Sequence, residues 1–247
     1  MKTQERKSYY GSDSNRQYNP VGVVARFYSR MYQREKSDSP DQSRVQLAKR
    51  IMPYMQQLGN DDYVLGLGSG TQLFEKQYLT TYTTNAKIVT LDIAEIERRR
   101  LLAIKYGVEH VVGDGSKLPF ADNVFSFAVS NMALDFMPEN AISELHRVLK
   151  PNAHALVGLH HPVLIPDDLE KLLEDPVIKQ NVRDVLNFWK YLKDNNILFT
   201  NPNEIRNRFE KHGFIVKRVR ETHDEHDKWW EVDLFNAKLW AREESNL

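Results

Sequence analysis

The sequence lacks cysteine throughout its 247 residues. It also lacks any run of about 18 apolar residues, the length that a membrane-spanning helix needs. The absence of cysteine excludes disulfides, zinc thiolates and a thiol nucleophile. The N-terminal segment, MKTQERKSYYGSDSNRQY, has no apolar core of the kind found in secretory signals. We therefore expect a cytoplasmic protein with no membrane span.

An excess of one charge is missing as well. The 34 Lys and Arg residues balance 34 Asp and Glu residues, whereas general nucleic-acid binders are strongly basic. Nucleic acid is therefore not an expected partner. Arg98, Arg99, Arg100 and Lys105 do lie close together in the sequence. We interpret them as an exposed helix face, with an RNA-binding surface as the alternative.

Apolar strands alternate with helical segments through most of the chain. Hydrophobic residues make up 41% of the composition, which is typical of a globular protein. Strands that are apolar throughout and separated by helices predict a parallel sheet covered on both faces. Two further strands, FIVKRVRET and WEVDLFNAKLW, are expected to pair antiparallel. The expected parallel strands span 63–67, 87–92, 110–114, 125–131 and 155–161.

Two segments do not fit this alternation. Residues 1–40 are predicted to form an N-terminal helical arm, and 41–247 to form the main domain. Within that domain, 162–200 interrupts the pattern after the fifth strand with two short amphipathic helices. Amphipathic insertions beside a pocket often close over it, so we expect this insertion to act as a lid.

A glycine-rich turn follows the first predicted strand, within VLGLGSGTQ at 64–72. Gly68 and Gly70 have no side chain and would let a ligand approach the backbone. Asp92 ends the second predicted strand, where a carboxylate can accept both hydroxyls of a ribose. The spacing fits neither the G-x-G-x-x-G dinucleotide pattern nor a P-loop, which argues against NAD, FAD and a nucleoside triphosphate.

Three segments together resemble one enzyme family. They are VLGLGSGTQ, VTLD at 89–92, and GDGSKLPFADNVFSFAVSNMALDFM at 113–137; ELHRVLKP at 144–151 adds to them. The chain resembles the class I S-adenosylmethionine-dependent methyltransferases over about 45–160, and is most similar to the quinone-biosynthesis branch. The resemblance implies a Rossmann-like α/β fold with a seven-stranded sheet and S-adenosyl-L-methionine as the cofactor.

The resemblance also implies a set of cofactor-binding residues. Asp92 is expected to contact the ribose and Asp114 to accept a hydrogen bond from the adenine amino group. Gly115 and Ser116 are expected to pass beside the adenine ring. The full expected set comprises Gly66, Gly68, Ser69, Gly70, Asp92, Ile93, Asp114, Gly115, Ser116 and Asn131.

The first motif departs from the family pattern at two positions. Gly66 stands where the family has an acidic residue, and Gln72 stands where it has a final glycine. Asp61 and Asp62 precede the strand, but they are expected at its opposite end. By the resemblance, the acid supports the amino-acid end of the cofactor. We therefore expect weakened binding, and we expect Gly66→Asp to tighten it if the strand accepts a side chain there.

Three residues are candidates for acid–base chemistry. His160 and His161 end the fifth predicted strand, where a methyl acceptor would lie, and Asp135 follows the fourth. Each could serve as a general base or have only a structural role. His223 and His226 lie in a predicted hairpin loop that does not fix both rings, so we expect no metal site there.

The leading interpretation is methyl transfer from S-adenosylmethionine to an oxygen, nitrogen or carbon of a small, partly apolar metabolite. One alternative is a catalytically silent methyltransferase-like protein that binds a partner, because Gly66 and Gln72 depart from the motif. An RNA methyltransferase is a second alternative. A reaction that uses the bound cofactor without net methyl transfer is a third. The acceptor and the oligomeric state stay open.

Overall fold

The computed structural model describes residues 42–70, 72–94, 105–161, 190, 192, 194, 198–223 and 228–237. The predicted arm at 1–40, most of the predicted lid at 162–200 and the arginines at 98–100 lie outside these residues. Their predicted roles stay predictions. Among the helices that the structure describes, none combines the length and the apolar character needed to cross a membrane.

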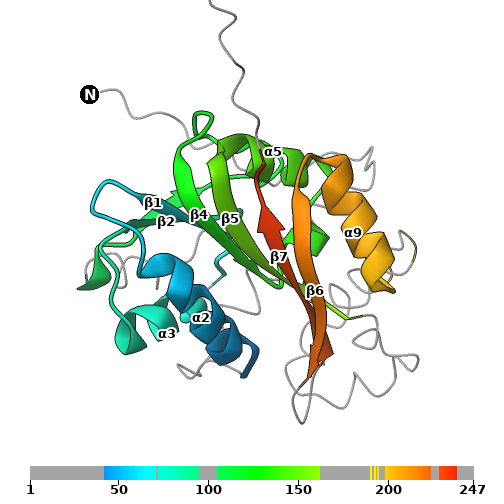
Figure 1. Cartoon of the computed structure of the whole chain (residues 1–247), viewed down its shortest axis with the longest axis horizontal. Helices are drawn as coiled ribbons and strands as arrows, with labels where there is room; N and C mark the ends of the chain where they lie inside the picture. Colours follow the sequence, from blue (N-terminus) through cyan, green and yellow to red (C-terminus); the bar gives the residue numbers. More distant parts are fainter. Residues whose placement is uncertain are drawn as a thin grey trace, which may run out of the picture.

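One mixed sheet of seven strands organises the described chain (Figure 1). The strand order is β3-β2-β1-β4-β5-β7-β6, with β7 antiparallel to both β5 and β6 and the other pairs parallel. The predicted seven-stranded α/β sheet with its antiparallel terminal pair is therefore confirmed. The strands are β1 Tyr63–Leu67, β2 Lys87–Asp92, β3 Glu109–Val112, β4 Phe125–Asn131, β5 Leu149–His160, β6 Ile215–His223 and β7 Lys228–Phe235.

Helices cover both faces of the sheet, as predicted. Successive residues of a strand face opposite sides, so each apolar strand serves two cores. On one face, Val64 of β1 packs in a cluster with residues of α2 (Gln42–Met55) and α3 (Leu73–Thr81). On the other, Leu65 packs in a cluster with residues of α5 (Asn140–Val148) and α9 (Pro202–Lys211).

The ends of several elements differ from the prediction. β1, β2 and β4 have the predicted bounds, whereas β3 ends before Asp114 and β5 begins six residues earlier, at Leu149 instead of 155. Asn236 explains the earlier start, because its side-chain amide donates to the carbonyl of Leu149 (2.9 Å) and to that of His146 (3.2 Å). This amide joins the end of α5 to the start of β5, and periodicity within a segment does not reveal such a contact.

The predicted cap of α9 is confirmed. The Asn201 side chain accepts a hydrogen bond from the Glu204 amide at 3.0 Å, and Pro202 is the first helical residue. The Glu204 carboxylate in turn accepts from the Thr200 amide at 2.9 Å. In a capping box the donor would be the next amide, that of the cap residue Asn201. These bonds satisfy amides that the helix itself leaves unpaired.

Candidate functional site

The strand order has a reversal point between β1 and β4. From β1 the chain continues to β2 and β3 on one side, whereas β4 and β5 lie on the other. Open α/β sheets bind ligands at the carboxyl ends of their strands at such a point. The turn after β1, Asp92 at the end of β2, Asp114 after β3 and Asp135 after β4 all follow carboxyl strand ends. The fold therefore gathers the predicted site residues along one edge.

The turn after β1 has the geometry that its glycines permit. Gly68 and Gly70 have φ values of 69° and 52°, in the left-handed region where glycine is favoured. The Gly68 amide donates to the carbonyl of Leu91 in β2 at 2.8 Å. A Cβ on Gly68 would overlap the side chain of Ala133, so the loop after β4 packs directly on this turn. The space that a side chain at Gly68 would take is thus filled by Ala133 and Met137, and the approach of a ligand there stays a prediction.

Asp92 joins the end of β2 to this turn. Its Oδ2 accepts from the Gly70 amide at 2.8 Å, and its Oδ1 accepts from the Ala94 amide at 2.8 Å. The residue is only 8% exposed. Each carboxylate oxygen has a second lone pair, so the group can hold the turn and still accept from a ligand. Half-buried Ile93 follows it directly.

Asp114 lies in the loop after β3. Its Oδ1 accepts from the Ser116 amide at 2.8 Å, and the Lys117 amide donates to its carbonyl at 3.0 Å. Among the described residues, none donates a hydrogen bond to Oδ2. A Cβ on Gly115 would lie 2.5 Å from the sulfur of Met137. The loop therefore fixes one carboxylate oxygen of Asp114 and leaves the other for a partner.

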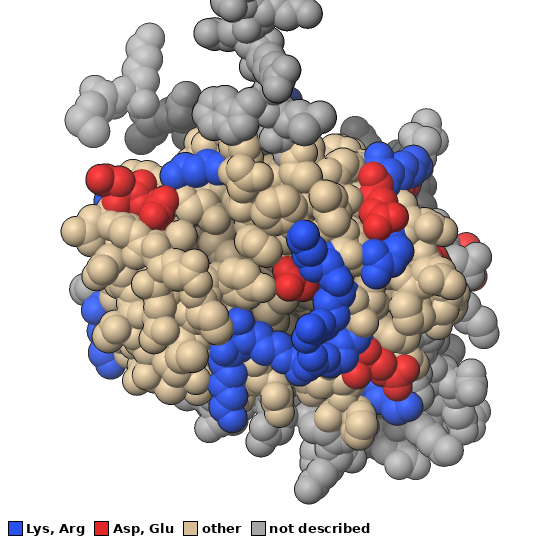
Figure 2. Space-filling view, in the orientation of Figure 1, with Lys and Arg blue, Asp and Glu red and all other residues tan. Residues whose placement is uncertain are grey.

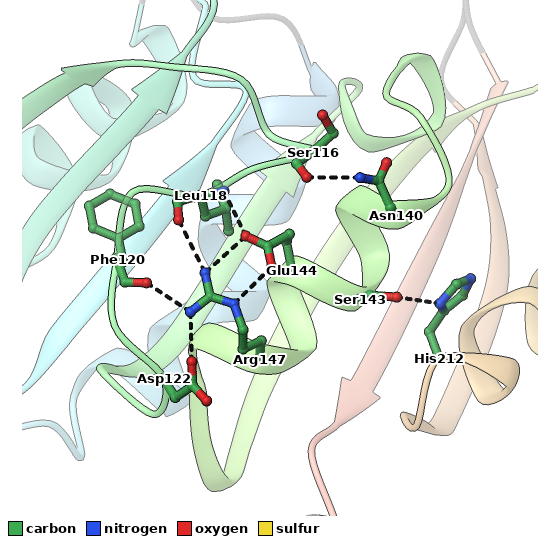
Figure 3. Close-up of polar contacts among 9 residues, drawn as sticks. All are labelled: Ser116, Leu118, Phe120, Asp122, Asn140, Ser143, Glu144, Arg147 and His212. Carbon is green, nitrogen blue, oxygen red and sulfur yellow. Dashed lines mark hydrogen bonds and ion pairs between the residues drawn. The ribbon is translucent and has the colours of Figure 1, made fainter.

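Two side chains of α5 clamp this loop (Figure 3). Arg147 donates to the carbonyls of Phe120 and Leu118 at 2.8 and 3.1 Å, and to the Asp122 carboxylate at 2.7 Å. Arg147 also makes two bonds to Glu144, at 2.8 and 2.9 Å, and Glu144 accepts from the Leu118 amide at 2.7 Å. These contacts connect ELHRVLKP to the GDGSKLPF segment, so two of the motifs form one structural unit.

The charges of the clamp stabilise each other. The Glu144 carboxylate, followed by that of Asp122, raises the pKa of Arg147 above its ordinary value. The hydrogen bonds from Arg147 lower the pKa of Glu144. Asn140 adds a contact nearer the site by donating to the Ser116 carbonyl at 2.9 Å (Figure 3). The position of Asp114 thus depends on a charged pair in a helix about 30 residues further along the chain, which the motif spacing alone did not reveal.

A carboxylate from α3 lies where a Gly66 side chain would be. A Cβ on Gly66 would be 2.5 Å from Oε1 of Glu75 and 3.1 Å from the Thr90 methyl. Glu75 is only 4% exposed. The first motif therefore has no acid at position 66, but the carboxyl group of Glu75 in α3 lies in the buried space beside that position. Residue spacing within the motif could not have shown this replacement.

Gln72 keeps the backbone shape that a glycine would adopt. Its φ and ψ are 60° and 27°, in the left-handed region. For a residue with a side chain this conformation costs about 1–2 kcal/mol. The side chain is fully buried and donates to the Thr90 hydroxyl at 2.6 Å, which offsets part of that cost. The turn thus retains its geometry without the final glycine.

Asp62 lies at the opposite edge of the sheet, as expected. It precedes β1 and accepts from the Ser126 hydroxyl, from the Gly59 amide at 2.9 Å and from the Lys150 ammonium at 3.1 Å. The Ser126 hydroxyl, followed by the Gly59 amide, lowers the pKa of Asp62 to about 2. Asp62 connects the amino-terminal ends of β1, β4 and β5 and cannot replace the acid missing at Gly66.

The expected gain from Gly66→Asp required space for a side chain at 66, and the Glu75 carboxyl group and the Thr90 methyl take up that space. We predict that Gly66→Asp destabilises the fold by about 2 kcal/mol more than Gly66→Ala, since it brings two carboxyl groups to one buried point. Both variants add the Cβ that meets Glu75, so their difference reports the effect of the added carboxyl group. Urea unfolding measures it, and Gly66→Asp combined with Glu75→Gln should recover most of the loss. Equal stability of the two single variants would contradict this prediction.

Asp135, which is buried, and His160, which is partly buried, form a pair. The Asp135 Oδ2 accepts from the His160 amide at 2.7 Å and contacts the ring Nδ1 at 3.0 Å. The Asp135 side chain is 0% exposed and that of His160 is 17% exposed. An ionised Asp135 only accepts hydrogen bonds, so this contact would place a ring proton on Nδ1 and leave the lone pair of a neutral ring on Nε2. The two residues were independent candidates in the sequence, and the structure brings them together.

His161 and Asn131 have different surroundings. The His161 ring packs on Trp230, with a centroid distance of 5.0 Å, and its Nε2 lies 3.8 Å from the Glu221 carboxylate. His161 is thus associated with β6 and β7 rather than with Asp135. Asn131 ends β4, and its Oδ1 would lie 3.0 Å from a Cβ on Gly158. His223 ends β6. Residues 224–227, which include His226, lie outside the described part of the chain.

Comparisons with known proteins show which families this chain is similar to. Residues 65–157 match a family described as the methyltransferase domain. The malonyl-acyl-carrier-protein O-methyltransferase of Methylococcus capsulatus is 39% identical over 93 residues, which are 36% of this chain and 34% of that protein. The chain thus spans about a third of that relative's length. The demethylmenaquinone methyltransferase of Staphylococcus aureus is 25% identical over 177 residues, 64% of this chain and 68% of that protein.

A solved structure shows the same fold over nearly the whole chain. The 1,6-didemethyltoxoflavin-N1-methyltransferase of Burkholderia thailandensis, crystallised with 1,6-didemethyltoxoflavin and S-adenosylhomocysteine, has a TM-score of 0.63 and 12% identity. The match covers 90% of this chain and 92% of that one. The strand order, the matched segment and this likeness lead to one conclusion: residues 65–157 are similar to the methyltransferase domain, and the chain has the Rossmann-like fold of the class I methyltransferases.

Proposed function

We propose that this protein transfers a methyl group from S-adenosylmethionine to a small, partly apolar acceptor. The observation that carries the proposal is the hydrogen bond between the Gly70 amide and the Asp92 carboxylate. It places a buried acid beside a glycine turn at the reversal point of the sheet, the arrangement that suits a nucleoside. The methyltransferase relatives support the same reaction class.

The residues at this edge fit the cofactor. Asp92 would accept from the ribose hydroxyls, and the Asp114 Oδ2 would accept from the adenine amino group. The Ser69 hydroxyl is buried and makes no hydrogen bond with the described residues, so it is available to a polar group of a ligand. Glu75 would place a carboxyl group beside position 66, which lacks one of its own. The loss of an acid at Gly66 thus does not favour a silent protein.

The His160–Asp135 pair would provide the acid–base chemistry. When bound, S-adenosylmethionine supplies a methyl group on a sulfonium, which is already a good leaving group. Asp135, 3.0 Å from Nδ1, would orient the imidazole and hold its proton on that nitrogen. Nε2 of His160 would then take the proton of an acceptor hydroxyl or amine. Holding the acceptor in line would account for much of the remaining rate.

A transfer assay tests the reaction and the base together. The full chain is incubated with S-adenosylmethionine labelled in its methyl group and with a panel of hydroquinones, catechols and carboxylic acids. We expect label in one of these acceptor classes. With that acceptor, His160→Asn should lower the initial rate by about tenfold or more. His161→Asn is the matched control, and an equal loss in both variants would contradict the assignment of His160 as the base.

A further inference from the structure

An irregularity in β6 gathers basic side chains on one face of the sheet. Val216 pairs with Leu234 and Arg218 pairs with Asp233, so Lys217 is an extra residue between them. Such a bulge changes the alternation of side chains along a strand. Arg218 and Arg220 both line the face that α2 covers, and the Lys217 ammonium lies 4.8 Å from the Phe235 ring.

This face contains a cavity of about 200 Å³ between α2 and the last strands of the sheet. Figure 2 shows Lys and Arg side chains gathered on this face of the molecule, with acidic side chains between them. The cavity lies beside the middle of β5 and β7, away from the carboxyl strand ends that form the predicted cofactor site. Its lining consists of Arg50, Tyr54, Leu156, Arg218, Arg220, Glu231 and Asp233.

The two carboxylates of the cavity already have partners. Glu231 pairs with Arg50 and accepts from the Trp229 indole at 3.1 Å. Asp233 accepts from the Tyr54 hydroxyl at 3.1 Å and lies 3.4 Å from Nδ1 of His154. Neither carboxylate forms an ion pair with Arg218 or Arg220 in the described part of the structure.

Arg218 and Arg220 thus leave positive charge at the mouth of the cavity. Both are exposed, and neither makes an ion pair with any described residue. Burial, followed by the charges of Arg220 and Arg218, lowers the pKa of Arg50. Charges on the last strand of a sheet can protect it from pairing with another chain. Protection of an edge strand requires charges along the strand. It does not explain why three guanidinium groups line one cavity.

We propose that this cavity binds a phosphate monoester. A guanidinium presents a planar set of N–H donors that matches phosphate oxygens, and several of them can share one doubly charged group. Tyr54 and Leu156 provide an apolar surface for a small organic body attached to the phosphate. The proposal concerns a second binding site and does not depend on the methyl-transfer proposal.

The test compares two anions and two double variants of the full chain. Inorganic phosphate and phenyl phosphate are titrated by calorimetry at constant ionic strength, with chloride as the background ion. Arg218→Gln/Arg220→Gln removes two exposed charges at the cavity. Lys87→Gln/Lys211→Gln removes two charges elsewhere, on β2 and α9, and is the matched control. Thermal melts of each variant show whether it is folded.

We expect saturable phosphate binding that is about tenfold or more weaker in the arginine variant and nearly unchanged in the lysine variant. Tighter binding of phenyl phosphate than of inorganic phosphate would support a small organic monoester as the ligand. Equal affinities would support recognition of the phosphate group alone, on any carrier. Absence of saturable binding to the unmodified chain, or equal weakening in both folded variants, would overturn the proposal.

Discussion

Replacing Asp92 with alanine is expected to weaken the binding of S-adenosylhomocysteine by about 100-fold, or roughly 3 kcal/mol. Two losses contribute to this effect. The ligand loses a charged acceptor for its ribose hydroxyls, and the Gly70 and Ala94 amides lose the carboxylate that now accepts from them at 2.8 Å each. The turn after β1 then loses its connection to the end of β2, so its shape should change as well.

Two further variants separate these losses. Asp92→Asn keeps a neutral acceptor and should therefore have an intermediate affinity. Glu109→Ala removes an exposed acid from β3, beside β2, and is the control for net charge. Calorimetry with S-adenosylhomocysteine measures all three, and thermal melts confirm that each variant is folded. An unchanged affinity in folded Asp92→Ala would remove Asp92 from the site.

Replacing Arg147 with glutamine is expected to lower the free energy of unfolding by about 2 kcal/mol, since several charge-assisted hydrogen bonds of a half-buried group are lost. The Arg147 side chain is 31% exposed, and solvent partly screens its pairs with Asp122 and Glu144. The larger part of the effect should come from the carbonyls of Leu118 and Phe120, which lose their donor. The loop that carries Asp114 should then become less ordered.

The matched control for Arg147→Gln is Arg208→Gln. Arg208 in α9 has a similarly exposed side chain, but its ion pair with Glu204 is longer, at 3.9 Å. We expect this variant to lose less than about 1 kcal/mol, from the surface pair and from the contact of the guanidinium with the Phe199 ring at 4.4 Å. Urea unfolding compares the two, and hydrogen exchange at residues 114–122 reports on the loop. Equal stability losses, with unchanged exchange in that loop, would contradict the role assigned to the clamp.

Local pattern was sufficient to predict most of the fold. The apolar runs at 63–67, 87–92 and 125–131 are strands with the predicted bounds because each is buried on both faces of the sheet. Asn201 and Pro202 begin α9 as expected, since capping involves residues only a few positions apart. The start of β5 was predicted too late because Asn236, far along the chain, holds it.

The candidate site was predictable in its positions but not in its contacts. Spacing predicted Asp92 and the family resemblance predicted Asp114; Asp92 ends β2, Asp114 follows β3, and these strand ends share one edge of the sheet. Glu75 was missed because it reaches the Gly66 position from the next helix, outside the motif. The Asp135–His160 pair and the Arg147 clamp were missed for a similar reason: their members are close only after the chain folds.

The binding of S-adenosylhomocysteine to the unmodified chain tests the central claim most directly. Isothermal titration calorimetry measures it without knowledge of the acceptor. We predict saturable binding at a single site, because the turn, Asp92 and Asp114 lie at the same edge of the sheet and offer acceptors for a nucleoside. A correctly folded protein that shows no binding at millimolar ligand would contradict the claim, and the methyltransferase fold would then serve another purpose in this protein.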